Sequence, residues 1–395
     1  MINIKKDIKD IKNELVEIRR DIHENPELGF EEFRTQGLII DLLEKEGIPY
    51  KKVAKTGVLG IIKGEGKENP NRCIGIRGDM DALPIEEKNG CPYASKIKGR
   101  MHACGHDAHT TILLGVAKVL NKNKDKFSGT VKLFFEPAEE TTGGAEIMIN
   151  EGVLDSPNVD CVIGLHVAED VEVGTIRIKN GMVNAASNPF KITIKGAGGH
   201  GAQPSATIDP IVIGANVVTA LQGIVSREIS AVNPAVVTIG KFHSGTAQNI
   251  IPEEAIIEGI IRTTTPEDRE FAIKRLEEIS KGVSASLRGE ATVEIEESYP
   301  CLINDSDIVD LIKESASYVL GSQNVIEQKN PSMGVESFAY FAMARKSAFY
   351  YLGTGNSEKG TDKPAHSRFF NIDEDALELG VEIQCTAALN YLTGK

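Results

Sequence analysis

Eight consecutive residues carry an unusual density of metal-binding side chains. The run His102-Ala103-Cys104-Gly105-His106-Asp107-Ala108-His109 holds three of the eight histidines and one of the six cysteines. Imidazole, thiolate and carboxylate are together the ligand types that suit a borderline-soft divalent metal such as zinc. The alternative, a loop with incidental polar residues, does not explain this density. Because one loop cannot complete a metal site, other parts of the chain must supply further ligands.

The adjacent carboxylates Glu139 and Glu140 are the second candidate feature. They follow the apolar run Val131–Phe135, which predicts a buried strand. Near a metal, one carboxylate can bind the ion while the other takes a proton from a water molecule. The alternative is a solvated acidic pair at a helix N-terminus, which the helix dipole favours.

Three further sets of polar side chains follow predicted strands or lie in a late loop. Asp79 and Asp81 come after the apolar run Cys73–Arg77, and His166 ends the run Cys161–Leu165. His366 lies in a polar loop, where simple exposure is the alternative reading. Support of a metal-bound histidine is the functional reading of the two aspartates, and a turn is the structural one.

The elements that must position these residues alternate between strands and helices. Ile8, Ile11, Leu15, Ile18 and Ile22 form one apolar stripe of a helix, and the later strand runs alternate with helical segments. This order predicts an α/β fold with a mostly parallel sheet and helices on both faces. In such sheets ligands bind beyond the carboxyl ends of the strands, so the candidate residues should converge there.

The middle of the chain has a different pattern. Strands are expected at Phe190–Ile194, Ala235–Ile239, Ala255–Ile261 and Ala291–Ile295, with helices that open at Asp209-Pro210 and Thr265-Pro266. The order βαββαβ is the ferredoxin-like arrangement. Strand and helix patterns of the first type then resume. We therefore predict a small domain at 187–297, inserted into a larger one formed by 1–186 and 298–395.

Size and charge limit the function further. A chain of 395 residues is too long for one hydrophobic core, which supports two domains. Its net charge of −13 argues against a nucleic-acid or anionic-membrane partner. The apolar stretch Ile211–Val225 is interrupted by polar residues, and we expect it to be too short for a membrane span. The scattered cysteines, without paired spacing, suggest a reducing, cytoplasmic setting.

Many of these motifs, taken in order, resemble the M20 metallopeptidases. Within them the chain is similar to the N-acyl-amino-acid amidohydrolases and carboxypeptidases, such as hippurate hydrolase, auxin-conjugate hydrolases and N-acetyldiaminopimelate deacetylase. The matching segments are Arg20–Gly29, Gly78–Pro84, His102–His109, Glu136–Glu140, Gly164–His166, Gly198–His200, Gln248–Pro252, Met333–Phe338 and Pro364–His366. They cover the chain nearly end to end.

The resemblance implies a role for each of these candidates. Two divalent metals, of the zinc, manganese, cobalt or nickel type, would be bound by Cys104, His106, Glu140, His166 and His366. Glu139 would be the general base and Asp81 a residue that supports the ligands. The reaction implied is hydrolysis of an amide bond in an N-acyl- or aminoacyl-amino acid that has a free carboxylate. His102 and His109 receive no ligand role and are expected to be structural or supporting.

The resemblance also gives the inserted domain a role in dimerisation and as a lid. His200 would reach the active site of the partner subunit in a homodimer, and Asn249 and Arg262 would help to hold the substrate's carboxylate. An exposed arginine at a strand end is the alternative for Arg262. The chain departs from many relatives at Ser205, where a second histidine is common, and at Val335–Phe338, where Gly-Glu-Asp-Phe is common. We expect both changes to affect specificity.

Three alternatives to this interpretation remain at this point. The first is a non-catalytic metal-binding or regulatory protein with the same fold, which would not need Glu139. The second is a thiol hydrolase that uses Cys104 with a nearby histidine. The third keeps the metal chemistry but has dipeptidase or carboxypeptidase activity as its main function.

Overall fold

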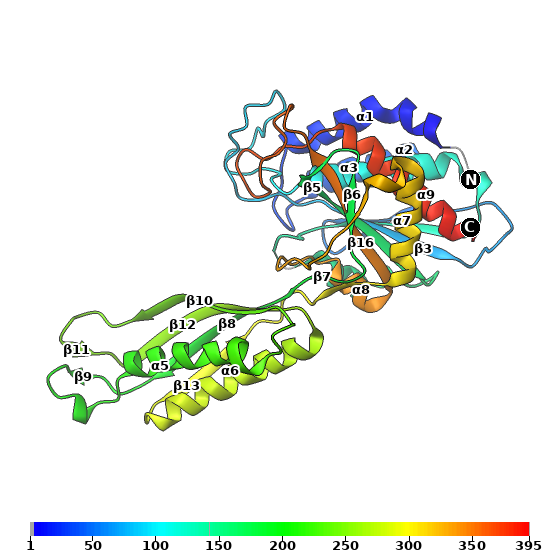
Figure 1. Cartoon of the computed structure of the whole chain (residues 1–395). Helices are drawn as coiled ribbons and strands as arrows, with labels where there is room; N and C mark the ends of the chain where they lie inside the picture. The colour runs from blue at the N-terminus through cyan, green and yellow to red at the C-terminus, as the bar shows by residue number, and fades with distance from the viewer. Residues whose placement is uncertain (1–3, 142, 395) are drawn as a thin grey trace. The chain divides into compact units, whose positions relative to one another are not determined.

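The computed structural model describes residues 4–141 and 143–394, which divide into two compact units (Figure 1). The first unit comprises Met1–Val183, Ile303–Asn330 and Ser337–Lys395, and the second comprises Asn184–Leu302 and Pro331–Glu336. The inserted domain was predicted at 187–297. The second unit also includes the short segment Pro331–Glu336, which lies far from the rest of that unit in the sequence and carries no pattern that assigns it there.

An eight-stranded mixed sheet forms the centre of the first unit, in the order β1-β2-β4-β3-β5-β16-β6-β15. The strands are β1 (Tyr50–Val53), β2 (Gly57–Lys63), β3 (Cys73–Asp79), β4 (Thr130–Glu136), β5 (Cys161–Glu172), β6 (Ile176–Ile178), β15 (Val325–Glu327) and β16 (Lys346–Gly355). The four central strands β4, β3, β5 and β16 are all parallel. Strands β3, β4 and β16 are almost entirely buried, as expected for strands covered on both faces. Two short strands, β7 (Gly181–Asn184) and β14 (Leu302–Asn304), form a separate pair.

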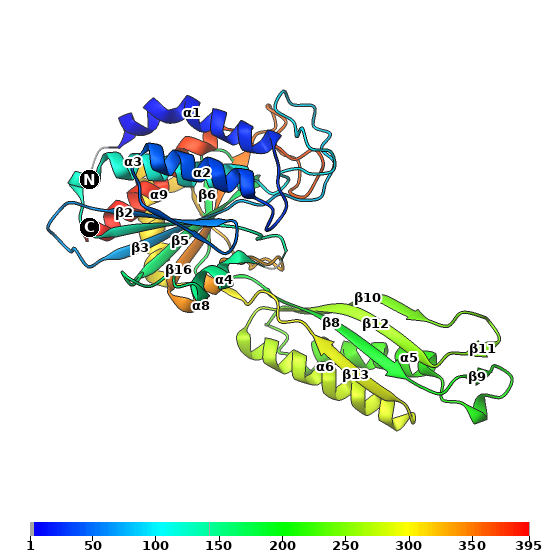
Figure 2. The ribbon, with the colours of Figure 1, turned by 180° about the vertical axis from the view of Figure 1, so that it is seen from behind.

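Helices cover both faces of this sheet (Figure 2). They are α1 (Lys5–Glu24), α2 (Phe33–Lys45), α3 (His106–Lys122), α4 (Gly144–Asn150), α7 (Ser306–Leu320), α8 (Ala339–Ala344) and α9 (Asp375–Thr393). Helix α3 packs directly on the central strands, and α1 packs on α3 and α9. The predicted stripe of α1 is confirmed: Ile8, Leu15, Ile18 and Ile22 are buried. On the other face, Phe341 of α8 stacks on Phe134 of β4, with ring centroids 5.1 Å apart.

The carboxyl ends of the central strands bring chemically active side chains to one edge of the sheet. Strand β3 ends at Asp79 and β4 ends at Glu136, immediately before the two acidic segments predicted to matter. The prediction that His166 ends its strand was wrong, because β5 continues to Glu172. His166 nevertheless lies beyond the last residue of β5 that pairs with β3, which is Gly164. It is therefore at the same edge as the acidic segments.

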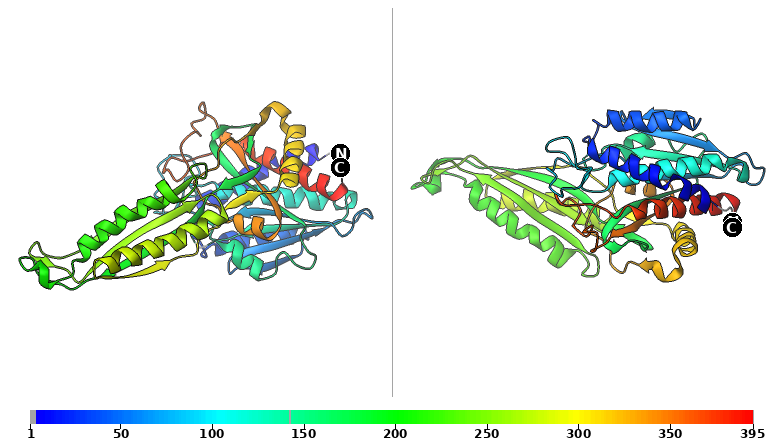
Figure 3. Two further views of the ribbon diagram at one scale, coloured as in Figure 1. Left: turned by 60° about the horizontal axis from the view of Figure 1, so that its bottom comes forward. Right: turned by 90° about the horizontal axis from the view of Figure 1, so that it is seen from above.

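The second unit has the predicted βαββαβ order. Its antiparallel sheet has the order β10-β12-β8-β13, the strand order of a ferredoxin-like fold, with α5 and α6 side by side on one face (Figure 3). The elements are β8 (Ala186–Lys195), β9 (Gly199–His200), α5 (Pro210–Gly223), β10 (Ala235–Ser244), β11 (Ile250–Ile251), β12 (Glu254–Thr263), α6 (Pro266–Ser286) and β13 (Glu290–Ile295). Both predicted helix starts are confirmed: Asp209 accepts from the N–H of Ile211, and Thr265 from that of Asp268.

The apolar stretch predicted to be too short for a membrane span is longer than expected. Helix α5 continues through a π-helical turn, Ile224–Glu228, so that the helical segment Pro210–Glu228 has 19 residues. By length and composition alone, this segment could cross a membrane. The core helix of a compact domain passes the same test, and Ile213, Val217 and Leu221 of α5 are buried in the core of the second unit.

Candidate metal centre

The five predicted metal ligands lie together in the first unit. The Sγ of Cys104 is 3.2 Å from Nε2 of His166, and Oε1 of Glu140 is 3.1 Å from Nε2 of His366. Nε2 of His106 lies 4.0 Å from the same oxygen of Glu140. Three overlapping groups have their donor atoms within 4.8 Å of one another: Cys104, His106 and His166; Cys104, Glu140 and His366; and His106, Glu139 and Glu140. These groups overlap through Cys104, His106 and Glu140, so the candidate ligands form one connected cluster.

The donor atoms fit divalent metals in type and spacing. Tetrahedral zinc with nitrogen or oxygen ligands at about 2.0–2.1 Å and sulfur at about 2.3 Å places neighbouring ligand atoms roughly 3.3–3.6 Å apart. The 3.1 and 3.2 Å separations above are close to this range. Nε2 of His106 is buried and has no hydrogen-bond partner among the described residues. A buried imidazole nitrogen without a partner is costly unless an ion or a water molecule satisfies it.

The start of α3 presents the two ligands from the His/Cys loop. His106 is the first residue of the helix, and Gly105 before it has a φ of 90°. A Cβ atom on Gly105 would lie 2.2 Å from Cγ2 of Val167, so no larger residue fits there. The late loop packs against the same segment, because the N–H of His366 donates to the carbonyl of Ala103 at 2.7 Å. This backbone hydrogen bond therefore holds His366 next to the loop that carries Cys104 and His106.

Asp81 connects the ligand loop to the acidic pair. Its Oδ1 lies 3.2 Å from Nδ1 of His106 and accepts the backbone N–H of Glu139 at 2.9 Å. Its Oδ2 accepts the backbone N–H of Glu140 at 3.0 Å. A carboxylate on Nδ1 leaves Nε2 of His106 as the nitrogen with a free lone pair, which is the usual arrangement behind a metal-bound histidine. This geometry agrees with the supporting role that was predicted for Asp81.

A hydrogen bond to its side chain also holds Glu139 in place. Its side chain is 7% exposed, and its Oε1 accepts the backbone N–H of Ser337 at 3.1 Å. The backbone before it is also anchored: Ala138 has a φ of 55°, and its N–H donates to Oε1 of the buried Glu32 at 2.8 Å. A positive φ at an alanine is strained, and such strain persists only where the surroundings enforce it. Glu139 is therefore oriented by several contacts rather than free in a loop.

Arg77 forms a buried network behind the acidic pair that the sequence analysis did not identify. Its Nη1 donates to Asp79 at 2.6 Å, its Nε to Glu136 at 2.6 Å, and its Nη2 to Oγ of Ser337 at 2.8 Å. An arginine inside an otherwise apolar strand was the available signal, because a buried charge requires partners. Ser337, one of the positions that the sequence analysis linked to specificity, is fully buried against Arg77 and Glu136.

Both ring nitrogens of His109 have partners behind the cluster, which agrees with the supporting role expected for it. Its Nδ1 lies 2.5 Å from Oδ1 of Asp79, and its Nε2 accepts the N–H of Val167 at 2.8 Å. Burial lowers the pKa of His109 to about 4, despite the opposing effect of Asp79. A neutral ring with Nδ1–H donating and Nε2 accepting matches both contacts. His102 is fully buried, and neither of its ring nitrogens has a hydrogen-bond partner among the described residues.

Strong electrostatic coupling marks the cluster. Burial raises the pKa of Glu140, but the hydrogen bond from His366 and the charge of His106 outweigh it and bring the pKa to about 2. Burial raises the pKa of Cys104 well above its usual range, and the carboxylate of Glu140 raises it further. Opposed shifts among close titratable groups are typical of a functional site.

Three predicted site residues belong to the second unit. His200, on β9, is exposed, and its Nδ1 accepts the N–H of Ala202 at 3.0 Å. Asn249 lies beside it, because its carbonyl accepts the N–H of Gly201 at 2.8 Å. Arg262 lies near the other end of β12, about 26 Å from the strand start at Glu254 by the rise per residue of a strand. Its Nη1 is buried without a hydrogen-bond partner among the described residues, and burial lowers its pKa.

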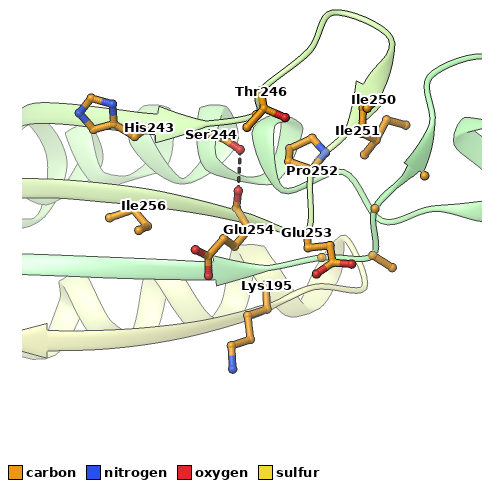
Figure 4. A pocket seen from close by; sticks show the side chains of 15 residues that line it. Lys195, His243, Ser244, Thr246, Ile250, Ile251, Pro252, Glu253, Glu254 and Ile256 are labelled. Atoms are coloured by element: carbon orange, nitrogen blue, oxygen red, sulfur yellow. Dashed lines mark hydrogen bonds between the residues drawn. The ribbon is translucent and has the colours of Figure 1, made fainter.

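A pocket of about 1210 Å³ lies next to the His200 segment (Figure 4). It is lined by Lys195–Gly199, His243–Thr246, Ile250–Glu254 and Ile256. Gly198 and Gly199, two residues of the motif that contains His200, form part of its wall. The ends of β8 and β10 and the start of β12 therefore form a hollow beside the segment predicted to reach a substrate.

Known proteins resemble this chain in sequence and in structure over nearly its whole length. The model of the peptidase family M20/M25/M40 matches residues 75–390. Thermostable carboxypeptidase 2 of Saccharolobus solfataricus is 38% identical over 393 residues, which cover 98% of each chain. The N-acetyl-L-cysteine deacetylase of Bacillus subtilis is 41% identical over 371 residues, or 94% of this chain and 86% of the deacetylase. Among solved structures, a dinuclear metal-binding peptidase of Bacillus subtilis from the M20 family has a TM-score of 0.84 and 34% identity, with 97% and 99% of the two chains covered.

Proposed function

Because the chain belongs to the peptidase family M20/M25/M40, we propose that it hydrolyses the amide bond of N-acyl- or aminoacyl-amino acids that carry a free carboxylate. Membership makes it a metal-dependent hydrolase of the dinuclear type, acting on amino-acid amides, conjugates or peptides. The observation that carries the finer proposal is the convergence of all five ligand candidates with a buried, oriented Glu139.

The residues of the first unit divide the chemistry between them. Two divalent ions, when bound, supply positive charge that acidifies a water molecule and polarises the amide carbonyl. Glu139 holds the water's proton on its carboxylate and later passes it to the leaving amine. Asp81 leaves Nε2 of His106 as the ring nitrogen that would hold an ion, and the N–H of Ser337 keeps the carboxylate of Glu139 in place.

The second unit contains candidates for recognition of the substrate's carboxylate. Arg262 is a half-buried cation with an unpartnered Nη1, which suits it to an anionic ligand. Asn249 and Arg262 lie at opposite ends of the same unit, so one chain cannot place both on a single carboxylate. We infer that the enzyme acts as a homodimer, in which His200 and Asn249 of one chain and Arg262 of the other serve the same substrate.

One rival mechanism has a specific observation in its favour. Cys104 Sγ lies 3.2 Å from Nε2 of His166, and Nδ1 of His166 lies 2.6 Å from the carbonyl of Val167. An oriented thiol–imidazole pair of this kind would also serve a thiol hydrolase. Exhaustive chelation separates the two mechanisms. Loss of activity with recovery on metal addition supports the metal mechanism, and activity that survives chelation contradicts it.

A substrate screen tests the proposed specificity. The enzyme, reloaded separately with zinc, manganese, cobalt or nickel, is offered N-acetyl-, N-benzoyl- and aminoacyl-amino acids, each also as its C-terminal amide. We expect hydrolysis of the free carboxylates and at least a tenfold lower kcat/KM for the amides, because the amides cannot pair with Arg262. Equal rates for both forms would contradict recognition of the carboxylate. A preference for aminoacyl over acyl groups would make peptidase activity the main function.

A further inference from the structure

A second group of metal-binding side chains lies in the first unit, separate from the five ligands described above. His23, near the end of α1, places its Nε2 3.1 Å from Oε1 of Glu87. The Sγ of Cys91 lies 3.8 Å from the same oxygen. The three donor atoms lie within 4.8 Å of one another. We propose that His23, Glu87 and Cys91 form a third metal site, which takes a zinc-like transition-metal ion.

The spacing and chemistry of the donors suit such an ion. Tetrahedral coordination by nitrogen, oxygen and sulfur places ligand atoms about 3.3–3.6 Å apart, and the two measured separations lie on either side of this range. A thiolate with an imidazole selects zinc, cobalt or nickel over magnesium and calcium. When the Glu87 carboxyl and the Cys91 thiol are both deprotonated, they supply two negative charges, which balance one dication.

Asp107 gives the site the support that metal-bound histidines normally have. Its Oδ2 lies 2.7 Å from Nδ1 of His23, while Nε2 of the same ring faces Glu87. A carboxylate on Nδ1 favours the tautomer that leaves the Nε2 lone pair available for a metal. Asp81 and His106 have the same relationship in the catalytic cluster. Nη2 of Arg19 also lies 3.2 Å from Nδ1 of His23, and the charge of Arg19 is paired with Asp107, whose Oδ2 lies 2.7 Å from its Nε.

The proposed site would add a metal-held link between two segments that already touch through Tyr93, which lies under Arg19 and Arg20, and through the N–H of Lys96, which donates to the carbonyl of Glu24. Between β3 and α3, residues 80–105 contain no helix and no strand of the main sheet. Glu87 and Cys91 belong to this segment, whereas His23 belongs to α1. Long irregular segments in compact domains are uncommon unless they are functional or restrained. A metal ion bound to all three residues would anchor the segment to α1, as structural zinc does elsewhere.

The proposed site is open to an ion from the surface and is separate from the catalytic cluster. Cys91 is partly exposed, whereas His23 is fully buried, so the donors run from the surface inwards. None of the three residues belongs to the catalytic cluster, and the proposal does not depend on the hydrolase activity. Its role would be structural, and its loss should lower stability more than turnover.

Cobalt titration of the chelator-treated full-length protein tests the proposal. We expect Cys91→Ser to bind one fewer cobalt ion per chain and to lose part of the thiolate-to-cobalt absorption. Cys104→Ser should keep the part that comes from Cys91. Cys301→Ser, which removes a buried thiol outside both clusters, should match the wild type. Unchanged cobalt binding and absorption in Cys91→Ser would overturn the proposal.

A second measurement on the wild type avoids any folding defect of the variants. Alkylation of the apo protein with iodoacetamide, read by peptide mass spectrometry, should label Cys91. Saturating cobalt should slow that labelling at least tenfold, because a metal-bound thiolate is blocked from reaction. The same protection should disappear in Glu87→Gln. Equal labelling of Cys91 with and without cobalt would show that His23, Glu87 and Cys91 form only a structural hydrogen-bonded group.

Discussion

The carboxylate of Asp81 accepts the backbone N–H of Glu139 at 2.9 Å. The same oxygen lies 3.2 Å from Nδ1 of His106. One side chain therefore sets both the position of the proposed base and the orientation of a proposed ligand.

Replacement of Asp81 by Asn should impair metal binding and turnover together. The amide group has one acceptor oxygen, so its NH₂ would face either a backbone N–H or the ring N–H of His106. We expect a 10–100-fold loss of metal affinity, measured by competition with a chromophoric chelator. Asp160→Asn, at the opposite end of β3 where Asp160 accepts the N–H of Cys73, is the control. Equal affinity in wild type and Asp81→Asn would contradict the supporting role.

Substitutions of Glu139 and Glu140 should have different effects. Glu139→Gln should keep both metals and lose about 10²–10⁴-fold in kcat, because the proton acceptor is removed while the ligands remain. Glu140→Gln should lose metal, as measured by elemental analysis after gel filtration. If Glu139→Gln lost metal while Glu140→Gln kept it, the two assignments would have to be exchanged.

Ser337→Ala should act on stability rather than on specificity. The change leaves Arg77 and Glu136 each without one buried hydrogen bond, which costs about 1–3 kcal/mol of unfolding free energy. The backbone N–H that binds Glu139 remains, so ratios of kcat/KM among substrates should not change. Ser280→Ala, which removes a local hydrogen bond to Leu276 in α6, should cost less. Altered substrate ratios in Ser337→Ala would restore the earlier expectation that this position affects specificity.

Mixing two inactive variants tests the proposed dimer. His200→Ala and Glu139→Ala each remove one half of a composite site. After subunit exchange, mixed dimers should contain one intact site and regain up to a quarter of the wild-type activity for an equal mixture. Exchange is followed by fluorescence energy transfer between labelled chains. Absence of recovery despite proven exchange would show that His200 does not act across a dimer.

Glu32 should make the protein less stable as the pH rises. Burial raises its pKa above the ordinary value, although Thr56 and Ala138 donate hydrogen bonds to it. A raised pKa in the folded state gives stability that is present below the unfolded value and lost as the pH rises through the folded value. The unfolding free energy of wild type minus that of Glu32→Gln should therefore fall as the pH rises above the ordinary pKa of a glutamate. Urea titrations across this range measure it, and a rising difference would contradict the assignment.

The sequence predicted those parts of the molecule that follow from local patterns. The apolar stripe of α1, the capped starts of α5 and α6, and the central strands all have such patterns, and the α/β fold with a ferredoxin-like insertion is confirmed. Helices α2, α4, α7 and α8 were not predicted. Helices α4 and α8 are short, so tertiary packing decides whether they form. Helix α7 does have a local signal, the Asp305 cap and the apolar stripe Ile308, Val309 and Ile312, which the sequence analysis did not use.

The candidate site was predicted as a set of residue types, but its internal contacts were not. The ligand set came from the resemblance to a family, and the roles of the individual residues stay predictions. The buried Arg77 network and the Glu32 anchor join segments far apart in the chain, so no local pattern could reveal them. The second group at His23, Glu87 and Cys91 was also missed, because His23 lies far from Glu87 and Cys91 in the chain.

The order of the ligands along the chain has a consequence for biosynthesis. Cys104, His106, Glu140 and His166 precede the second unit, whereas His366 follows it. A growing polypeptide therefore leaves the ribosome with four of the proposed ligands long before the fifth, and the whole insertion must be translated between them. With this proposed ligand set, full metal loading would wait for nearly complete synthesis. Truncated chains that stop inside the insertion would then lack hydrolytic activity.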